Sequence, residues 1–157
     1  MKTDSKRDNV KSLRQYVTAR IAGQLFGLPI EAVQEVFTPE GITQVPLAPV
    51  AIEGVLNLRG RIVTALSMRR VLGYTDGDQA GRSMAIGVEY RGEPYGLIVD
   101  EIGEVCTVDT SESEPPPANF DRRWAAIVGS VHRLPAELMV ILDVGRTVGG
   151  APAELRA

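Results

Sequence analysis

The sequence predicts a mainly β fold with two similar small barrels of about five short strands each, together with short helices. Apolar and polar residues alternate along segments such as residues 84–90, which is typical of a strand with one buried face. A pattern from the first half of the chain returns in the second half. Three consecutive prolines, Pro115, Pro116 and Pro117, mark a loop between strands because proline cannot donate to a sheet.

The expected strands and helices follow in order along the chain. Val17, Ala19 and Ile21 alternate with polar residues in the first strand, and Gly23 then permits a tight turn because glycine adopts positive φ angles. Gly92 does the same after residues 84–90. The other expected strands are residues 54–58, 61–66, 95–99, 103–108, 127–131 and 138–142, and the expected short helices are residues 29–36, 68–72 and 144–148.

An internal repeat supports two copies of one unit. One shift along the sequence, which we call the first shift, places Phe26 on Tyr95, and both segments read aromatic-Gly-Leu, then aliphatic and acidic residues, and then Glu-Val. A larger shift, which we call the second shift, places Leu66 on Leu142 and aligns the residues that follow them. The second copy therefore contains extra residues, and the proline-rich segment 111–119 is where we expect them.

The repeat also predicts the domain organisation. Residues 1–14 are polar and charged and are expected to form a flexible arm, and residues 150–157 a C-terminal tail. Between them lies one domain, residues 15–149, with a first barrel at about 15–73 and a second at about 83–149. The sequence leaves open whether strands exchange between the two barrels.

Charge and composition argue against nucleic acid as a partner. The chain has 17 basic and 20 acidic residues and a net charge of −3, and its aromatic content is 5%. Some small β-barrels bind single-stranded nucleic acid, but they need exposed aromatic side chains on a basic face. This chain has no dense basic tract. We therefore expect a partner that is a protein.

The residues that could be reactive form no catalytic or metal-binding pattern. Cys106 is the single cysteine and His132 the single histidine, so neither an internal disulfide nor a Cys/His zinc site can form. We expect Cys106 to be a small buried residue and His132 to be structural or at the surface. Glu112 and Glu114 lie beside the prolines and are expected to be solvated. No enzyme activity, cofactor or metal is predicted.

The localisation expected from the sequence is cytoplasmic. A single cysteine suits a reducing compartment, and the polar N-terminal residues lack the apolar segment of a signal peptide. No apolar run approaches the roughly 20 residues that cross a bilayer as a helix. We therefore expect no direct membrane insertion, and any recruitment to a membrane would depend on partners.

The most specific pattern is VPLAPVAIEGVLNLRGRIVTALSMRR, residues 45–70. Pro46 and Pro49 stiffen an extended approach. Two strands then flank Arg59 and Gly60, which predicts a two-residue hairpin turn. Arg59 would lie at a barrel rim, where its guanidinium either makes a forked contact with a carboxylate or is simply solvated.

This segment resembles the signature of the CheW family, V-P-x-A-P-x-x-I-x-G-V-x-N-L-R-G-x-I-V. Residues 26–36, 95–100 and 139–144 also resemble parts of that family. The family usually has proline and aspartate where this chain has Thr64 and Ser67. Thr64 offers a backbone N–H for pairing along a strand edge, and Ser67 removes a negative charge. The matching residues are Val45, Pro46, Ala48, Pro49, Ile52, Gly54, Val55, Asn57, Leu58, Arg59, Gly60, Ile62 and Val63.

The resemblance implies a fold and a function. The fold is two five-stranded SH3-like β-barrels packed around a shared core, with short helices. The function is that of an adaptor that couples chemoreceptors to the histidine kinase CheA in bacterial chemotaxis. The partners are the regulatory domain of the kinase and the cytoplasmic hairpin tip of the receptors. An adaptor for a kinase array that controls pili, development or biofilms is the alternative.

The resemblance also implies which residues contact these partners. Glu35 and Arg59 are expected to form an ion pair at the edge of a groove and to orient side chains for a partner. The full expected partner-binding set is Val33, Glu35, Asn57, Leu58, Arg59 and Gly60.

Overall fold

The described part of the chain folds into ten strands with a few short helices. The computed structural model describes residues 12–74 and 83–149. The strands are β1 (Leu13–Ile21), β2 (Gln24–Pro29), β3 (Glu35–Phe37), β4 (Ile52–Leu58), β5 (Arg61–Ser67), β6 (Met84–Tyr90), β7 (Glu93–Val99), β8 (Glu101–Asp109), β9 (Val128–Arg133) and β10 (Leu138–Leu142). The helices are α2 (Met68–Val71), α3 (Arg122–Ile127) and one over residues 144–149, with 3-10 turns at Ile30–Ala32 and Thr110–Glu112.

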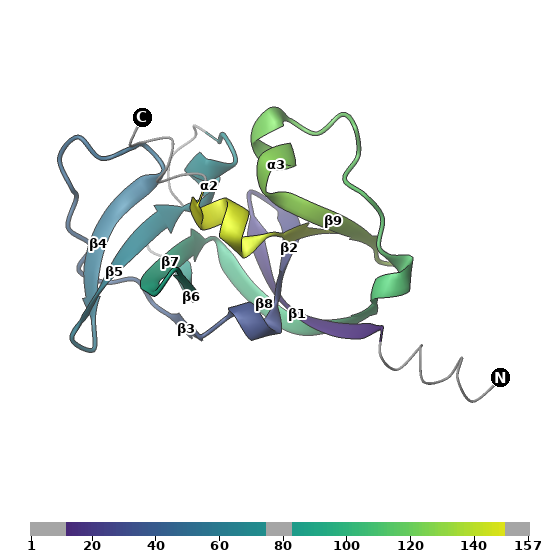
Figure 1. Cartoon of the computed structure of the whole chain (residues 1–157), viewed down its shortest axis with the longest axis horizontal. Coiled ribbons are helices and arrows are strands. Elements are labelled where there is room, and N and C mark those ends of the chain that lie inside the picture. Colours follow the sequence, from purple (N-terminus) through teal and green to yellow (C-terminus); the bar gives the residue numbers. More distant parts are fainter. Residues whose placement is uncertain (1–11, 75–82, 150–157) are drawn as a thin grey trace.

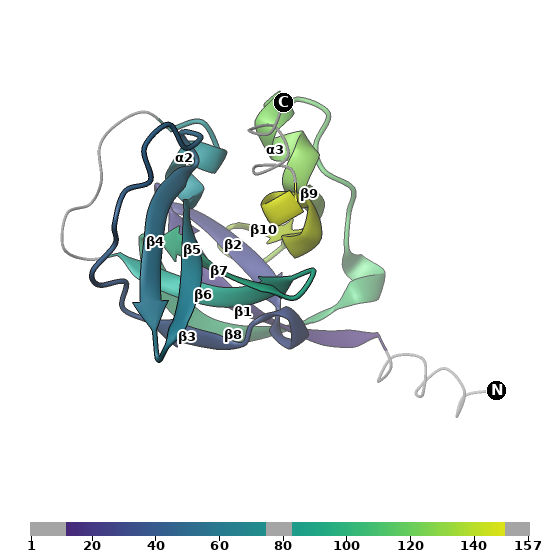
Figure 2. The same ribbon diagram turned by 60° about the vertical axis from the view of Figure 1, so that its left-hand side comes forward.

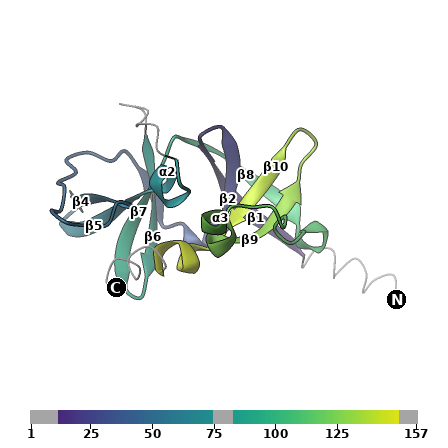
Figure 3. The ribbon, with the colours of Figure 1, turned by 90° about the horizontal axis from the view of Figure 1, so that it is seen from above.

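The strands form two five-stranded sheets that lie side by side (Figures 1 and 3). Sheet A has the order β8-β1-β2-β10-β9, and sheet B has the order β3-β6-β7-β5-β4. Each sheet therefore contains strands from both halves of the sequence. The mainly β class and the five-stranded units agree with the prediction. The sequential division into barrels at about 15–73 and about 83–149 does not match the sheets, because β1 and β2 pair with β8 and β10, and β3 pairs with β6. The strand exchange that the sequence left open is the arrangement observed.

The two sheets repeat one another strand by strand and in register. Val17 pairs with Leu28 in sheet A, and their counterparts under the first shift, Ile86 and Leu97, pair in sheet B. Each sheet also contains one parallel contact, β10 with β2 and β5 with β7. The internal repeat is therefore a repeat of sheet positions, although each sheet is assembled from both copies.

An isolated bridge links the two edges of each sheet. The segment after β3 reaches β4 through Thr43 and Val55, and the segment after β8 reaches β9 through Glu114 and Val131. In both bridges the two residues exchange backbone N–H···O bonds of 2.8–2.9 Å. The ladders themselves stop at β3 and β4 in one sheet and at β8 and β9 in the other, so the described sheets are linked edge to edge only by a single bridge and do not close into continuous barrels.

A core shared by the two sheets holds them together. Phe26 and Leu28 of β2 and Val140 of β10 face this core from sheet A, and Leu66 of β5 and Leu97 of β7 face it from sheet B. All five side chains are at most 1% exposed. Figure 2 shows the sheets meeting, with α2 and α3 at one end of the contact. Burial of one such side chain contributes roughly 1.5–3 kcal/mol to the free energy of folding. Because the buried side chains come from both sheets, the cluster joins the sheets into one folding unit.

An aromatic cluster closes one end of the shared core. The ring of Trp124 in α3 lies 5.3 Å from Phe26 and 5.4 Å from Phe120, centroid to centroid. Its indole N–H donates to the carbonyl oxygen of Leu72 at 3.1 Å, which satisfies the one polar atom of the side chain. Trp124 therefore packs at the margin of the barrels and ties α3 to the end of α2.

Some sequence-based expectations differ from the structure. Residues 29–36 were expected to be helical, but only Ile30–Ala32 form a turn, and β3 then begins because the N–H of Gln34 donates to Gly87 of the opposite strand. The expected arm of residues 1–14 is too long at its C-terminal end, since β1 starts at Leu13. Residues 1–11 of that arm, and the tail of residues 150–157, lie outside the described residues. Helix α3 was not expected.

Within residues 12–74 and 83–149, no helix is long and apolar enough to cross a membrane.

Replacing Gly54 with alanine is expected to lower the free energy of unfolding by about 1–3 kcal/mol. Gly54 has a φ of 156° beside a register irregularity in β4. A Cβ atom there would collide with the carbonyl oxygen of Thr43, which belongs to the bridge that completes sheet B. Urea denaturation measures the loss. Gly60→Ala is the control, because its positive φ is penalised without any such collision. Equal losses in the two variants would contradict this explanation.

Candidate functional site

The turn between β4 and β5 forms an exposed corner of sheet B. Arg59 and Gly60 have φ angles of 53° and 86°, which is the two-residue hairpin turn that the sequence predicted. The side chain of Asn57 fixes the turn, since its Oδ1 accepts a hydrogen bond of 2.9 Å from the Gly60 N–H. The Asn57 side chain therefore holds the backbone of the turn in place. The side chains that the corner presents at its surface are those of the neighbouring residues.

The ion pair expected at this corner is present. The Arg59 Nη2 atom donates to Glu35 Oε1, which brings β3 and the β4–β5 turn together. The Arg59 side chain is 70% exposed and the Glu35 side chain 33% exposed. An ion pair with this exposure contributes only about 0–1 kcal/mol to stability. Its main effect is on the direction in which the guanidinium points.

A groove of about 280 Å³ lies beside this ion pair. We call it the corner groove. Phe37, Leu58 and Tyr95 supply apolar surface, and Arg59 and Arg61 supply positive charge at its edge. The full lining is Gln34, Glu35, Phe37, Leu58, Arg59, Arg61, Val63, Gly87, Val88, Pro94 and Tyr95. The lining thus combines a few apolar side chains with a larger polar and charged surface, a combination that suits the binding of a protein segment.

The structure brings together some of the expected partner-binding residues and separates one. Glu35, Leu58 and Arg59 line the corner groove, while Asn57 and Gly60 shape its turn. Val33 is only partly exposed, packs against the shared core and is not among the residues that line this groove.

The sequence did not indicate several residues of the corner groove. Pro94 and Tyr95 come from β7, and Arg61 follows the turn on β5. Tyr95 lies beside Thr64 because β7 pairs with β5, a contact between the two halves of the chain. The aromatic-Gly-Leu repeat had marked Tyr95 as special, but only the exchange of strands explains its place in this groove.

The residues considered for chemistry remain separate in the structure. Among residues 12–74 and 83–149, no three His, Cys, Asp or Glu side chains cluster in a way that could hold a metal ion. His132 is 3% exposed, and burial lowers the pKa of its imidazole, so it is a neutral core residue at neutral pH. Cys106 is half-buried, not buried as expected. Glu114 is also half-buried and accepts a 2.8 Å hydrogen bond from Arg133.

Comparison with known proteins identifies the family. The model of the CheW-like domain matches residues 15–150, nearly the whole described chain. This chain belongs to the CheW-like family. The crystal structure of the scaffolding protein TtCheW from Thermoanaerobacter tengcongensis superposes with a TM-score of 0.77 at 32% identity, covering 85% of this chain and 91% of that one. The two five-stranded sheets are therefore the architecture of a CheW scaffold.

Curated relatives in the family have different names. Chemotaxis protein CheW of Treponema pallidum is 26% identical over 83% of this chain and 79% of its own length. Protein PilI of Pseudomonas aeruginosa is 31% identical over 80% of this chain and 76% of its own length. The family is one of adaptors and scaffolds, and relatives outside chemotaxis exist within it.

The two departures from the family pattern have structural roles here. Thr64 lies in β5, which is flanked by β7 and β4, so its backbone pairs within the sheet and not at a free edge. Ser67 is the N-cap of α2, where its hydroxyl accepts a 3.3 Å hydrogen bond from the Arg70 N–H. A serine serves as a helix N-cap about as well as an aspartate, so the local fold keeps this function.

Proposed function

We propose that this chain is an adaptor that couples chemoreceptors to a CheA-type histidine kinase. The observation that carries the proposal is the corner groove of a CheW-family scaffold, with Arg59 oriented by Glu35. One surface of the adaptor binds the regulatory domain of the kinase, and another binds the cytoplasmic hairpin tip of a receptor. The adaptor is cytoplasmic and reaches the membrane through these partners.

The chemistry of the corner groove suits the binding of a protein surface. Phe37, Leu58 and Tyr95 provide apolar area that contributes to affinity when it is buried. Arg59 presents a planar group with several donors, suited to a carboxylate or to backbone carbonyls of the partner. Single contacts of this kind are weak, and the tethering of several partners in one array raises the effective concentration of each.

A second pathway is compatible with the same surface. Protein PilI is 31% identical to this chain, a higher identity than that of the Treponema CheW. An adaptor in a kinase array with an output such as pili, development or biofilms would use the same groove. The identity of the kinase and receptor that co-purify with the chain from its own cells distinguishes the two pathways.

Arg59→Ala is expected to weaken binding to the kinase or to the receptor by about tenfold or more, as for an interface arginine. The fold should be unchanged, because the side chain is 70% exposed. Arg91→Ala is a matched control. Arg91 occupies the same turn position between β6 and β7, with a φ of 52°, but lies outside the corner groove. Titrations of each variant with the purified kinase domain and receptor fragment, together with circular dichroism spectra, measure both effects. Unchanged affinity of the Arg59 variant for both partners would refute the proposed role.

A further inference from the structure

His132 is a buried histidine with an unsatisfied ring nitrogen. In the part of the chain that the structure describes, its Nε2 is the only buried side-chain nitrogen or oxygen without a hydrogen-bond partner. His132 lies in β9 opposite Met139 of β10, and its ring centroid is 6.0 Å from that of Tyr16 in β1. Tyr16 and Met139 belong to the core within sheet A, with Cys106 packed beside them. A buried polar atom without a partner costs free energy, and the adaptor function proposed above does not use it.

Three carboxylates of one segment, residues 109–114, act on this imidazole. Asp109 ends β8, Glu112 lies in the 3-10 turn that follows, and Glu114 forms the isolated bridge with Val131, the residue before His132. Burial has the largest effect on the imidazole and lowers its pKa, whereas the three carboxylates raise it. The imidazole is therefore neutral in the core, and a cationic imidazole would be attracted toward this segment.

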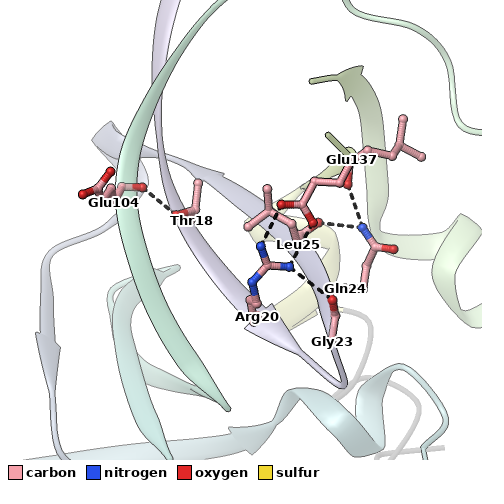
Figure 4. A network of polar contacts seen from close by, with 8 residues as sticks. Thr18, Arg20, Gly23, Gln24, Leu25, Glu104 and Glu137 are labelled. Carbon is pink, nitrogen blue, oxygen red and sulfur yellow. Dashed lines mark hydrogen bonds and ion pairs between the residues drawn. The ribbon is translucent and has the colours of Figure 1, made fainter. Parts of the chain in front are cut away.

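The other charged groups near this core pair with one another. Figure 4 shows Arg20 of β1 donating to both carboxylate oxygens of Glu137, at 2.9 and 2.7 Å, and to the carbonyl oxygen of Gly23. Arg133, the neighbour of His132 in β9, donates to the Glu114 carboxylate at 2.8 Å. Residues 109–114 therefore supply the negative charge that acts on His132.

Few bonds hold this segment against β9. Glu114 and Val131 exchange two backbone N–H···O bonds of 2.9 Å, and the ion pair of Glu114 with Arg133 is largely exposed. The ladder of sheet A stops at β9, so no further strand supports this edge. At the other end of the segment, Asp109 accepts a 2.6 Å hydrogen bond from the hydroxyl of Ser12. The segment is therefore anchored at Asp109 and can open at Glu114 for a small free energy.

We propose that His132 is a proton-sensitive switch that opens one edge of sheet A. While the imidazole is neutral, it stays in the core and the bridge between Glu114 and Val131 is closed. When the ring takes up a proton from solvent, the imidazolium turns toward the carboxylates of residues 109–114 and the bridge opens. This edge of sheet A thus loosens when the interior of the cell acidifies, and a protein bound across it would be released.

The direction of the pH effect follows from which form binds the proton more tightly. In the open form the imidazole is solvated and has its ordinary pKa, near 6.5, while burial holds the pKa of His132 lower in the closed form. Above about pH 6.5 both forms are neutral, and the closed form has its full stability. As the pH falls below that value, the open form binds the proton first. The equilibrium constant for opening then rises by up to about tenfold per pH unit, until the closed form is also protonated.

Amide hydrogen exchange of the purified, untagged full chain, followed by NMR, tests the proposal. Between pH 7.5 and pH 5.5, the protection of the Glu114 and Val131 amides should fall by about tenfold after correction for the intrinsic exchange rate. The bridge between Thr43 and Val55 in sheet B is the matched control, because it has the same pair of backbone bonds and the single histidine of the chain lies in sheet A. Its protection should stay constant.

Two further measurements separate the switch from general acid destabilisation. Because the chain has one histidine, the ring Cε1–H resonance reports the titration of His132 alone, and its midpoint should lie below about pH 6.5. His132→Gln keeps a polar side chain that does not titrate, so the protection of Glu114 and Val131 should no longer depend on pH.

Four outcomes would overturn the proposal. They are unchanged protection of Glu114 and Val131, an equal loss at the two bridges, the same loss in His132→Gln, and a titration midpoint at or above the ordinary value. If His132→Gln does not fold, the comparison of the two bridges in the wild type still decides. The corner groove belongs to sheet B, so titrations with kinase and receptor fragments at constant pH test the adaptor function separately.

Discussion

Replacing Arg69 with methionine is expected to lower the free energy of unfolding by about 3–5 kcal/mol at neutral pH. Arg69 in α2 donates to both oxygens of the Asp100 carboxylate, at 2.9 and 2.8 Å. Their side chains are only 11% and 17% exposed. The N–H of Ala22 donates to the same carboxylate at 2.8 Å. The variant leaves a mostly buried carboxylate without its cation, at the point where the β1–β2 turn meets the end of sheet B.

The loss should depend on pH. Hydrogen bonds from Arg69 lower the pKa of Asp100 in the folded protein, and burial opposes them. The wild type therefore has the full contribution of this group above the ordinary aspartate pKa, near 4, and loses it as the pH falls below that value. In the variant, burial remains and raises the pKa, so the folded state can take up a proton at Asp100. The difference between the two proteins should shrink from pH 7 toward pH 4.

Urea denaturation of both proteins at pH 7 and pH 4 measures this difference. Arg146→Met is the control, because Arg146 pairs with Asp143 at 3.4 Å and both side chains are about half exposed. That substitution should change the free energy of unfolding by at most about 1 kcal/mol. A pH-independent loss in the Arg69 variant would show that the arginine contributes packing and not charge.

Phe26→Ala is expected to cost about 3–5 kcal/mol and to destabilise both sheets together. Phe26 is fully buried in the shared core and contacts the aromatic ring of Trp124. Because that core contains residues from both sheets, a cavity there removes contacts from each of them. Unfolding should remain a single transition at a lower denaturant concentration.

Two probes monitor this second prediction. Trp124, the one tryptophan of the chain, reports the core by fluorescence, and circular dichroism reports the sheets. Leu47→Ala is the control, since Leu47 is fully exposed and its truncation should change the free energy of unfolding by about 0.5 kcal/mol or less. Two separate transitions, or a loss close to that of the control, would contradict the shared core.

The sequence predicted the strands well because alternation and turn residues are local signals. The hairpin turns at Gly23, Gly60 and Gly92 all have the positive φ angles expected of them. The helix expected at residues 29–36 failed because pairing of β3 with β6 outweighs a weak local preference. The sequence pattern did not predict helix α3, because the helix is short and because polar residues follow its N-cap, Asp121.

The exchange of strands could not be derived from the repeat. Equivalent residues occupy equivalent sheet positions whether a strand pairs with its own copy or with the other, so the sequence pattern is the same in both cases. The candidate site shows the same limit. The resemblance to the CheW family supplied Glu35 and Arg59, whereas Pro94 and Tyr95 reach the corner groove only through the contact of β7 with β5.

The position of β10 in sheet A has a consequence for synthesis of the chain. β10 lies between β2 and β9, yet it follows every other strand of the described residues in the sequence. The edge of β2 that receives β10 therefore stays open until residue 142 has emerged from the ribosome. An open strand edge is a template for aggregation. The nascent chain is thus vulnerable along this edge until β10 arrives, and a chaperone that covers β2 over that interval would protect it.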